Sequence, residues 1–121
     1  MNTKRKVLIV EDEMIIALMI EQMITRLGHV VLDKVTTGEA AVEAALATSP
    51  DLILMDIRLG GKIDGIEAMQ QIRKRKNIPV IYISGNTDRI DKNNLQQNGN
   101  TVFLTKPISY QALNKTVGVA S

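Results

Sequence analysis

The fold is decided by the stretch DLILMDIRLGG at residues 51–61. Four apolar residues, 52–55, follow Pro50 closely, and a short continuous apolar run of this kind is typical of a strand buried on both faces of a parallel sheet. Asp56 comes directly after the run. An ionised carboxylate at the end of a buried strand is costly unless a metal ion, a cation or several hydrogen-bond donors meet it. The stretch therefore predicts a buried parallel strand and a charged partner for Asp56.

The rest of the chain repeats this alternation of strand and helix. We expect strands at residues 6–10, 30–35, 52–55, 79–83 and 101–104. We expect helices at residues 13–27, 38–48, 65–76, 88–97 and 110–118. Strands that alternate with helices form βαβ units, and right-handed crossovers then place helices on both faces of one parallel sheet.

Several of the expected helix ends carry typical capping residues. Gly28 suits the end of the first helix. The sequence Thr36-Thr37-Gly38-Glu39 resembles a capping box at the start of the second helix. Asp64, with Glu67 three residues later, suits the start of the third helix, and Ser109 suits the start of the last.

The composition is that of one ordinary globular domain. The chain has 121 residues, of which 45% are hydrophobic and 23% charged. We therefore expect a single domain over residues 1–121, with a short basic tail at 1–5 and no output domain. The absence of cysteine excludes disulfide scaffolds, thiolate zinc sites and thiol catalysis. The net charge of +2, with two tyrosines and one phenylalanine as the aromatic residues, argues against direct binding of nucleic acid.

Neither a signal peptide nor a membrane span is expected. The first apolar run ends at Glu11, which is too early for the hydrophobic region of a signal peptide. The longest apolar run, residues 14–20, is far shorter than the roughly 20 residues that a membrane span needs. We therefore expect a cytoplasmic protein with no membrane partner.

Polar residues follow four of the five expected strands. The chemistry of a doubly wound sheet gathers outside the carboxyl ends of its strands, and there the chain delivers Glu11 and Asp12, then Asp56, Ser84 and Lys106. Three carboxylates would repel one another unless a cation bound between them, and Mg²⁺ accepts carboxylates together with waters and phosphate oxygens. A lysine and a hydroxyl complete the groups that a phosphoryl group needs. With no histidine or second lysine nearby to act as a base, an aspartate is the sensible nucleophile.

Four motifs stand at these strand ends in order: VLIVEDE at 7–13, LILMDIRL at 52–59, VIYISGN at 80–86 and VFLTKP at 102–107. Together they resemble the receiver domain of response regulators in two-component signalling, the histidine-to-aspartate phosphorelay. The resemblance covers nearly the whole chain. It implies an α/β, doubly wound, flavodoxin-like (βα)5 sandwich, whose five-stranded parallel sheet has the strand order 2-1-3-4-5.

The resemblance also implies a metal site and a phosphoacceptor. Asp56 matches the aspartate that accepts the phosphoryl group and also binds the metal. Asp12 matches the direct Mg²⁺ ligand, Glu11 the acid that binds through water, and the backbone carbonyl of Arg58 the remaining protein ligand. The expected cofactor is Mg²⁺, with Mn²⁺ as a substitute.

Further positions match the parts of the family's switch. Ser84 and Lys106 match the hydroxyl and ammonium that hold the phosphoryl oxygens, and Phe103 matches the aromatic residue whose ring turns inward with the hydroxyl residue. The peptide bond between Lys106 and Pro107 matches one that the family usually holds cis. For these residues, as for the metal ligands, the roles rest on the resemblance.

The resemblance implies a signalling domain rather than an enzyme. It would take a phosphoryl group from a histidine kinase or a histidine phosphotransfer protein onto Asp56, and catalyse only its own phosphorylation and dephosphorylation. The switched face would be built by the fourth helix, fifth strand and fifth helix, where an output protein or domain docks or the domain dimerises. We further expect the Arg58 side chain to slow the loss of the phosphoryl group, with Asn86 beside the same path; the alternative is that the arginine points to solvent.

Other interpretations stay open at this point. A Mg²⁺-dependent phosphatase with an aspartate nucleophile would usually have a second aspartate where this chain has Arg58. A flavodoxin-like binding protein would have a phosphate loop where this chain has acids, at residues 11–13. The domain is either a stand-alone receiver or part of a larger regulator or hybrid kinase. The loop after Asp56 also lacks the proline that many receivers carry and is one residue longer than the commonest form.

Overall fold

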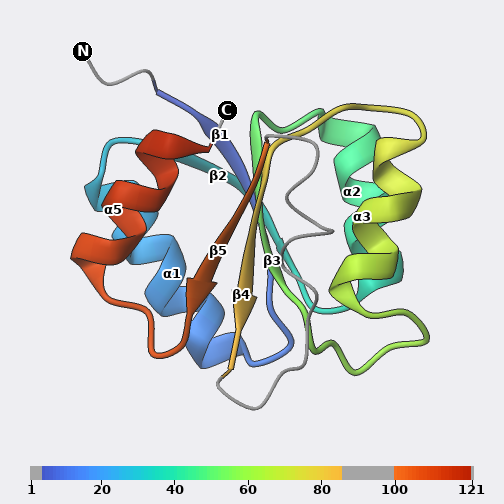
Figure 1. The fold of residues 1–121 in the computed structure, drawn as a ribbon, viewed down its shortest axis with the longest axis horizontal. Coiled ribbons are helices and arrows are strands. Elements are labelled where there is room, and N and C mark those ends of the chain that lie inside the picture. Colours follow the sequence, from blue (N-terminus) through green and yellow to red (C-terminus); the bar gives the residue numbers. More distant parts are fainter. Residues whose placement is uncertain (1–3, 86–99, 121) are drawn as a thin grey trace.

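The computed structural model describes residues 4–85 and 100–120 and shows one parallel sheet with helices on both faces (Figure 1). Its strands are β1 (Lys6–Val10), β2 (Val30–Val35), β3 (Leu52–Asp56), β4 (Val80–Ser84) and β5 (Thr101–Thr105). Its helices are α1 (Met14–Arg26), α2 (Gly38–Thr48), α3 (Gly65–Arg73) and α5 (Tyr110–Val119). The helix expected at 88–97 lies outside the described residues.

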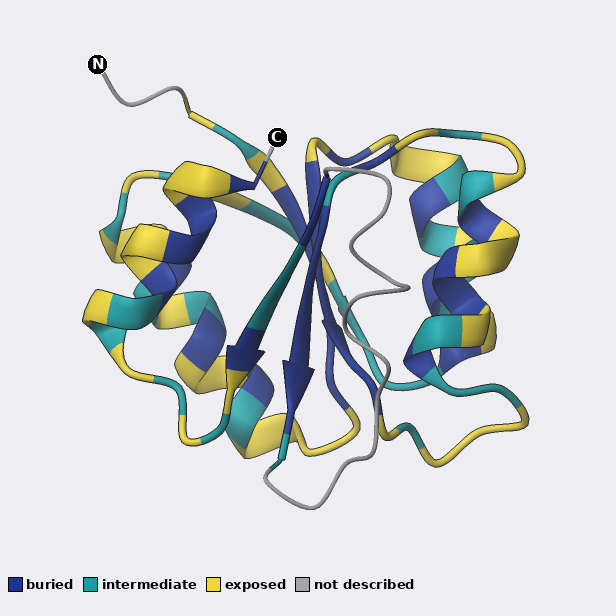
Figure 2. Cartoon of the chain, in the orientation of Figure 1, coloured by how far each residue is buried: buried dark blue, intermediate teal, exposed yellow. Residues whose placement is uncertain are grey.

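The sheet has the strand order β2-β1-β3-β4-β5, and every pair of neighbouring strands is parallel. This confirms the predicted flavodoxin-like topology. Helices α1 and α5 cover one face of the sheet, and α2 and α3 cover the other (Figure 1). β3 lies at the centre of the sheet, and each of its five residues is buried (Figure 2).

Two apolar cores lie on the two faces of the sheet, because successive side chains of a strand point to opposite sides. In β1, Val7 and Ile9 belong to the core under α1 and α5, whereas Leu8 and Val10 belong to the core under α2 and α3. The continuous apolar runs of the sequence thus serve two cores at once. Within the described part of the chain, no helix has the length and apolarity that a bilayer crossing requires.

The helix boundaries follow the capping residues, with two corrections. The Asp64 side chain accepts a hydrogen bond from the N–H of Glu67, whose own side chain accepts one from the N–H of Asp64, so the capping box of α3 is complete. The expected end of α3 at Lys76 is wrong: the helix ends at Arg73, and residues 74 and 75 form a turn. The second correction concerns the predicted capping box of α2: the N-cap Thr37 accepts from the N–H of Ala40, but the Glu39 side chain accepts from another loop.

The side chain of Arg73, the last residue of α3, contacts the segments around the starts of β4 and β5. Its guanidinium donates to the carbonyl of Ile78 at 3.1 and 3.3 Å, to the carbonyl of Asn100 at 3.1 Å and to Oγ1 of Thr101 at 2.9 Å. These contacts tie the end of α3 to the starts of β4 and β5. We call this group the Arg73 network; it lies at the amino edge of the sheet, opposite the site described next.

Candidate functional site

The strand register brings the polar residues of the sequence to one edge of the sheet. Val10 pairs with Met55, and Asp56 pairs with Ile83, so the residues that follow β1, β3 and β4 emerge side by side. Ser84 pairs with Thr105 in the last strand pair. This is the carboxyl edge, to which the strand arrows point in Figure 1.

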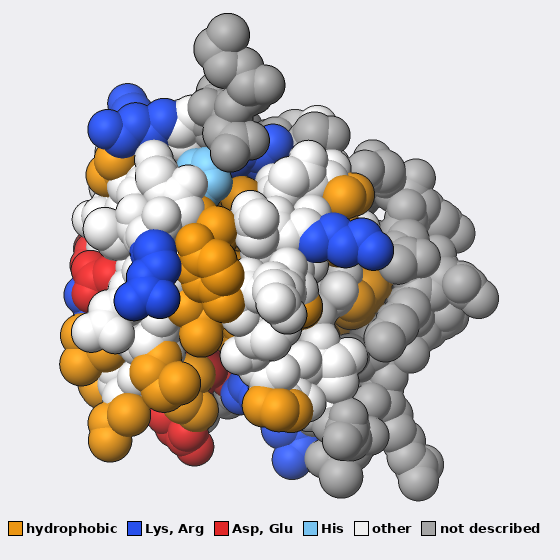
Figure 3. Space-filling view, turned by 90° about the vertical axis from the view of Figure 1, so that its left-hand side faces the viewer, with side chains coloured by type: hydrophobic (Ala, Val, Ile, Leu, Met, Phe, Trp, Pro, Cys, Tyr) orange, Lys and Arg blue, Asp and Glu red, His pale blue; other side chains and the backbone are white. Residues whose placement is uncertain are grey.

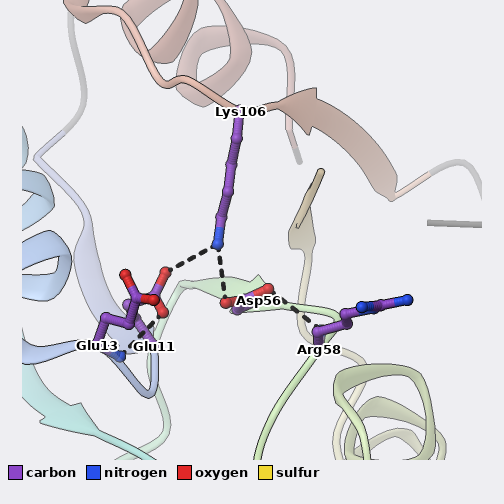
Figure 4. A network of polar contacts seen from close by, with 5 residues as sticks. All are labelled: Glu11, Glu13, Asp56, Arg58 and Lys106. Atoms are coloured by element: carbon purple, nitrogen blue, oxygen red, sulfur yellow. Dashed lines mark hydrogen bonds and ion pairs between the residues drawn. The ribbon is translucent and has the colours of Figure 1, made fainter. Parts of the chain in front are cut away.

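Asp56 ends β3 and is only 2% exposed. Its Oδ2 accepts a hydrogen bond from Lys106 Nζ at 3.1 Å, and its Oδ1 accepts one from the backbone N–H of Arg58 at 3.2 Å (Figure 4). The cost of burying this carboxylate is therefore met by an ammonium and an amide. Lys106 is thus the charged partner of Asp56.

Glu11 is fully buried beside Asp56. Its Oε2 accepts from the N–H of Glu13 at 3.1 Å, while its Oε1 lies 3.5 Å from Lys106 Nζ and has no hydrogen-bond partner (Figure 4). Burial raises the pKa of Glu11 to about 7; the hydrogen bond from Glu13 opposes this shift, and the neighbouring Asp12 and Asp56 add to it. An orphaned buried oxygen is an open position for a ligand.

Asp12 completes the acidic cluster. Glu11, Asp12 and Asp56 each offer a carboxylate oxygen, and these atoms all lie within 4.8 Å of one another. Two of the acids, Glu11 and Asp56, contact the ammonium of Lys106. Burial lowers the pKa of Lys106, but its contacts with Asp56 and Glu11 outweigh this effect and leave the pKa above its ordinary value. An all-oxygen donor set with excess negative charge suits a hard divalent cation.

The remaining predicted residues lie on β4, on β5 and just after β5. Ser84 is 3% exposed, and its carbonyl accepts from the N–H of Lys106 at 2.8 Å. The ring of Phe103 packs on that of Tyr82 with the centroids 5.5 Å apart. The peptide bond between Lys106 and Pro107 is cis, as the resemblance implies.

Arg58 and Asn86 are the two residues expected to govern the lifetime of the phosphoryl group. The Arg58 side chain extends away from Asp56 (Figure 4), so it would need another rotamer to cover a group on that carboxylate. Its effect on the lifetime stays a prediction. Asn86 lies outside the described residues.

Glu39 is a residue near the site whose contacts sequence reasoning missed. The sequence predicts a capping-box role for Glu39, but its Oε1 accepts instead from the backbone N–H groups of Lys62 and Ile63, each at 3.0 Å. The partners are 23 and 24 residues away along the chain. No local pattern could have revealed this contact, because it depends on how α2 packs beside the loop after β3.

Fold and site together define a class of protein: a doubly wound parallel domain whose carboxyl edge holds an acidic cluster and a lysine. Comparison with known families then gives the particular family. The family model of the response regulator receiver domain matches residues 7–118, so the chain belongs to that family. Receiver domains of response regulators are in general signalling domains rather than enzymes, and they bind Mg²⁺ through an acidic cluster such as this one.

Curated relatives include transcriptional regulators. The chain is 34% identical over 112 residues to the uncharacterized transcriptional regulatory protein YrkP of Bacillus subtilis, covering 93% of this chain and 47% of that protein. It is 29% identical over 116 residues to the transcriptional regulatory protein PdtaR of Mycobacterium tuberculosis, covering 96% of this chain and 56% of that protein. The chain thus spans about half the length of the curated relatives it matches.

Solved receiver structures are similar over almost the whole chain. The signal receiver domain of a modulated diguanylate cyclase from Desulfovibrio desulfuricans has a TM-score of 0.85 and 30% identity, with 98% of this chain and 94% of that chain covered. A variant of the anti-anti-sigma factor PhyR from Bartonella quintana has a TM-score of 0.80 and 32% identity, with 98% and 48% covered.

Proposed function

We propose that the domain is a cytoplasmic phospho-accepting switch that takes a phosphoryl group onto Asp56 from a histidine kinase or a histidine phosphotransfer protein. The observation that carries this proposal is the position of Asp56: a buried carboxylate between an ammonium and two further acids. Asp12, Glu11, Asp56 and the carbonyl of Arg58 would hold Mg²⁺. When bound, the ion neutralises charge on the carboxylates and the phosphoryl oxygens.

The chemistry of this chain's residues follows from their contacts. A carboxylate oxygen of Asp56 attacks phosphorus, a P–O bond forms, and the P–N bond to the donor histidine breaks with its electron pair passing to the imidazole nitrogen. Lys106 already donates to Asp56, and its ammonium is placed to follow the oxygens of the incoming group. The Ser84 hydroxyl would donate to another phosphoryl oxygen.

The surface beside Lys106 supports docking of a protein phosphodonor. Helix α1 exposes four large apolar side chains, those of Met14, Ile15, Leu18 and Met19. Figure 3 faces the α1 and α5 side of the molecule and shows hydrophobic side chains gathered there. A cavity of about 440 Å³ between α1 and the loop after β5 is lined by apolar residues, and Lys106 lines it too. A donor seated on α1 would therefore bring its phosphohistidine to the site.

The output is a second docking event. We propose that phosphorylation alters the face of the fourth helix, β5 and α5, and that an output protein or domain, or a second copy, binds there. Ser84 and Phe103 support this route, since β4 and β5 join them to the phosphoacceptor and to that face. The fourth helix itself falls outside the described residues.

The two rival functions find less support at this site. For a phosphatase, the acid–base residue would have to replace Arg58, whose side chain points away from Asp56 (Figure 4). For a flavin or nucleotide binder, the loop after β1 carries a fully buried glutamate where phosphate would have to bind. Among the described residues, the site thus lacks the acid–base residue of a phosphatase. The acids after β1 would repel the phosphate of a flavin or nucleotide.

The test is labelling with acetyl phosphate in the presence of Mg²⁺. The wild type should acquire a hydroxylamine-sensitive label and bind beryllofluoride only with Mg²⁺, and Asp56→Asn should lose both. Asp33→Asn, an exposed aspartate on β2, is the control with the same chemical change and should keep them. A stable hydroxylamine-sensitive label on the Asp56 variant would show that another residue is the acceptor.

A further inference from the structure

The loop between β3 and α3, residues 57–64, is attached to the rest of the domain at its base and at its far end. At the base, the N–H of Gly65 donates to the carbonyl of Ile57 at 2.9 Å. At the far end, one oxygen of Glu39 on α2 accepts from two successive backbone N–H groups, those of Lys62 and Ile63. We call these two hydrogen bonds the Glu39 clamp.

The first turn of α2 and the loop pack closely against each other around the Glu39 clamp. A Cβ atom on Gly38 would lie 2.6 Å from Cγ1 of Ile63, so only glycine lets the loop approach the first turn of α2. A Cβ atom on Gly61 would lie 2.8 Å from Oε2 of Glu39. The side chain of Ile63 is half-buried and packs on the core under α2 and α3.

The clamped segment adjoins the acidic cluster. Going back along the loop from Lys62, a Cβ atom on Gly60 would lie 3.9 Å from Oδ2 of Asp12, an ordinary van der Waals contact. Two residues earlier, the N–H of Arg58 donates to Asp56. The loop therefore runs from one acid of the cluster past another before it reaches Glu39.

We propose that Glu39 is a positioning residue of the metal site: it holds the loop after the phosphoacceptor against α2, so that residues 58–60 stay beside Asp12 and Asp56 in the arrangement that binds a divalent cation. This inference rests on the proposed function, which assigns the cluster to Mg²⁺. The simpler role of an acid in the first turn of a helix is the stabilisation of the helix dipole. That role does not require a carboxylate directed at two amides of another loop, each at 3.0 Å.

Calorimetric titration of the full chain with Mg²⁺ tests the proposal through three variants. Glu39→Ala removes the clamp and should weaken binding about ten-fold, the lower end of what outer-shell partners of a metal contribute. Glu39→Gln keeps a carbonyl oxygen that can accept the amides and should lose less. The two variants change the net charge equally, so the difference between them reports the hydrogen bonds and not the charge. Glu43→Gln, an exposed acid on the same helix, is the matched control and should bind as the wild type does.

Amide hydrogen exchange, measured without metal, gives an independent result. In Glu39→Ala, the amides of Lys62 and Ile63 should exchange about ten-fold faster, while amides of the strands keep their protection. The urea midpoint of each variant shows whether the fold is intact. The proposal is overturned if Glu39→Ala binds Mg²⁺ as tightly as the wild type, or if exchange accelerates equally throughout the domain.

The proposed function and the clamp can fail separately. Absence of Mg²⁺ binding in the wild type would remove the proposed function and, with it, the role of Glu39 in the metal site. Exchange at Lys62 and Ile63 would still report whether Glu39 holds the loop. Normal wild-type binding with an unchanged Glu39→Ala affinity would instead remove only the positioning role.

Discussion

At the scale of single residues, Glu11 is a buried acid whose ionisation is costly. Its pKa is raised to about 7, first by burial and then by its acidic neighbours. In the unfolded chain it titrates near its ordinary value of 4.5. The folded, metal-free protein therefore holds this proton more tightly than the unfolded chain does. The stability gained from Glu11 is complete below the unfolded pKa and is lost as pH rises through the folded one.

This sign gives a prediction for the metal-free protein. With a chelator present, the urea midpoint of the wild type should fall between about pH 5 and about pH 8 by more than that of Glu11→Gln, which has no carboxyl to ionise. Mg²⁺ should restore stability mainly at the higher pH, because it binds the ionised form. Unfolding followed by circular dichroism measures this, with Glu43→Gln as the control for an exposed acid. An identical pH dependence in wild type and Glu11→Gln would contradict the assignment.

The residues of the cluster could be predicted from the sequence, whereas Glu39 could not. Glu11, Asp12 and Asp56 each follow an apolar run, and the topology alone brings the ends of such runs to one edge. Glu39 contacts a loop that begins after the next strand. The pattern of residues 36–39 fits a capping box, which is a local structure, so local reasoning gave the side chain the wrong partner.

At the scale of elements, α1 stands out for its exposed apolar side chains. A helix of a globular domain normally turns one apolar stripe to the core, and α1 does so with Ala17, Ile20 and Ile24. Its exposed apolar residues form a second stripe, which has no partner among the described residues of the chain. An exposed apolar surface of this kind lowers solubility and is typical of a site where another protein binds.

If the phosphodonor protein docks on α1, a substitution there should slow transfer from that protein without affecting the phosphorylation reaction itself. Ile15 is 77% exposed, and Ile15→Asp should slow transfer from a phosphorylated histidine kinase about ten-fold, the loss of a moderate interface contact. Labelling by acetyl phosphate should be unchanged, because a small donor needs no docking surface. Val119→Asp, on the 62% exposed end of α5, is the control. If Ile15→Asp slowed phosphorylation by the kinase and by acetyl phosphate equally, Ile15 would act in the reaction or in the fold and not in docking.

The boundaries of helices and strands could be predicted where the local sequence contains a clear signal, such as a capping residue or the end of an apolar run. β1 and β2 begin and end as expected, and the Asp64 cap sets the start of α3. The end of α3 has no such local signal, and its last residue, Arg73, contacts Ile78 and Thr101, which lie later in the sequence. Contacts between residues far apart in the sequence cannot be read from the local sequence pattern.

At the scale of the whole molecule, the proposed switch requires that phosphorylation at one edge alters a face built in part by β5 and α5. Tyr82 and Phe103 stand on adjacent paired strands with their rings in contact, so a movement at the end of β4 can pass to β5 through them. Coupling of this kind requires an element with two arrangements that both sites bias. We expect the Phe103 ring to be that element.

NMR spectra with Mg²⁺ and beryllofluoride test the coupling. Chemical-shift changes should extend from the site into residues 101–110 in the wild type. In Phe103→Ala they should stay near the acidic loops, although beryllofluoride still binds. Tyr82→Phe, which keeps the ring contact and removes only the hydroxyl, is the control. Changes confined to the acidic loops in the wild type would mean that the domain does not switch through this face.

The Arg73 network has a consequence for protein engineering. It joins α3, β4 and β5 at the edge of the sheet remote from the acidic cluster, so the framework and the reactive loops are secured by separate sets of contacts. Chimaeras that exchange the loops after β1 and β3 for those of another receiver should therefore keep the parent scaffold, provided that residue 39 on α2 is exchanged together with the loop after β3 that it contacts. A library of such grafts could vary the lifetime of the signal on one constant framework.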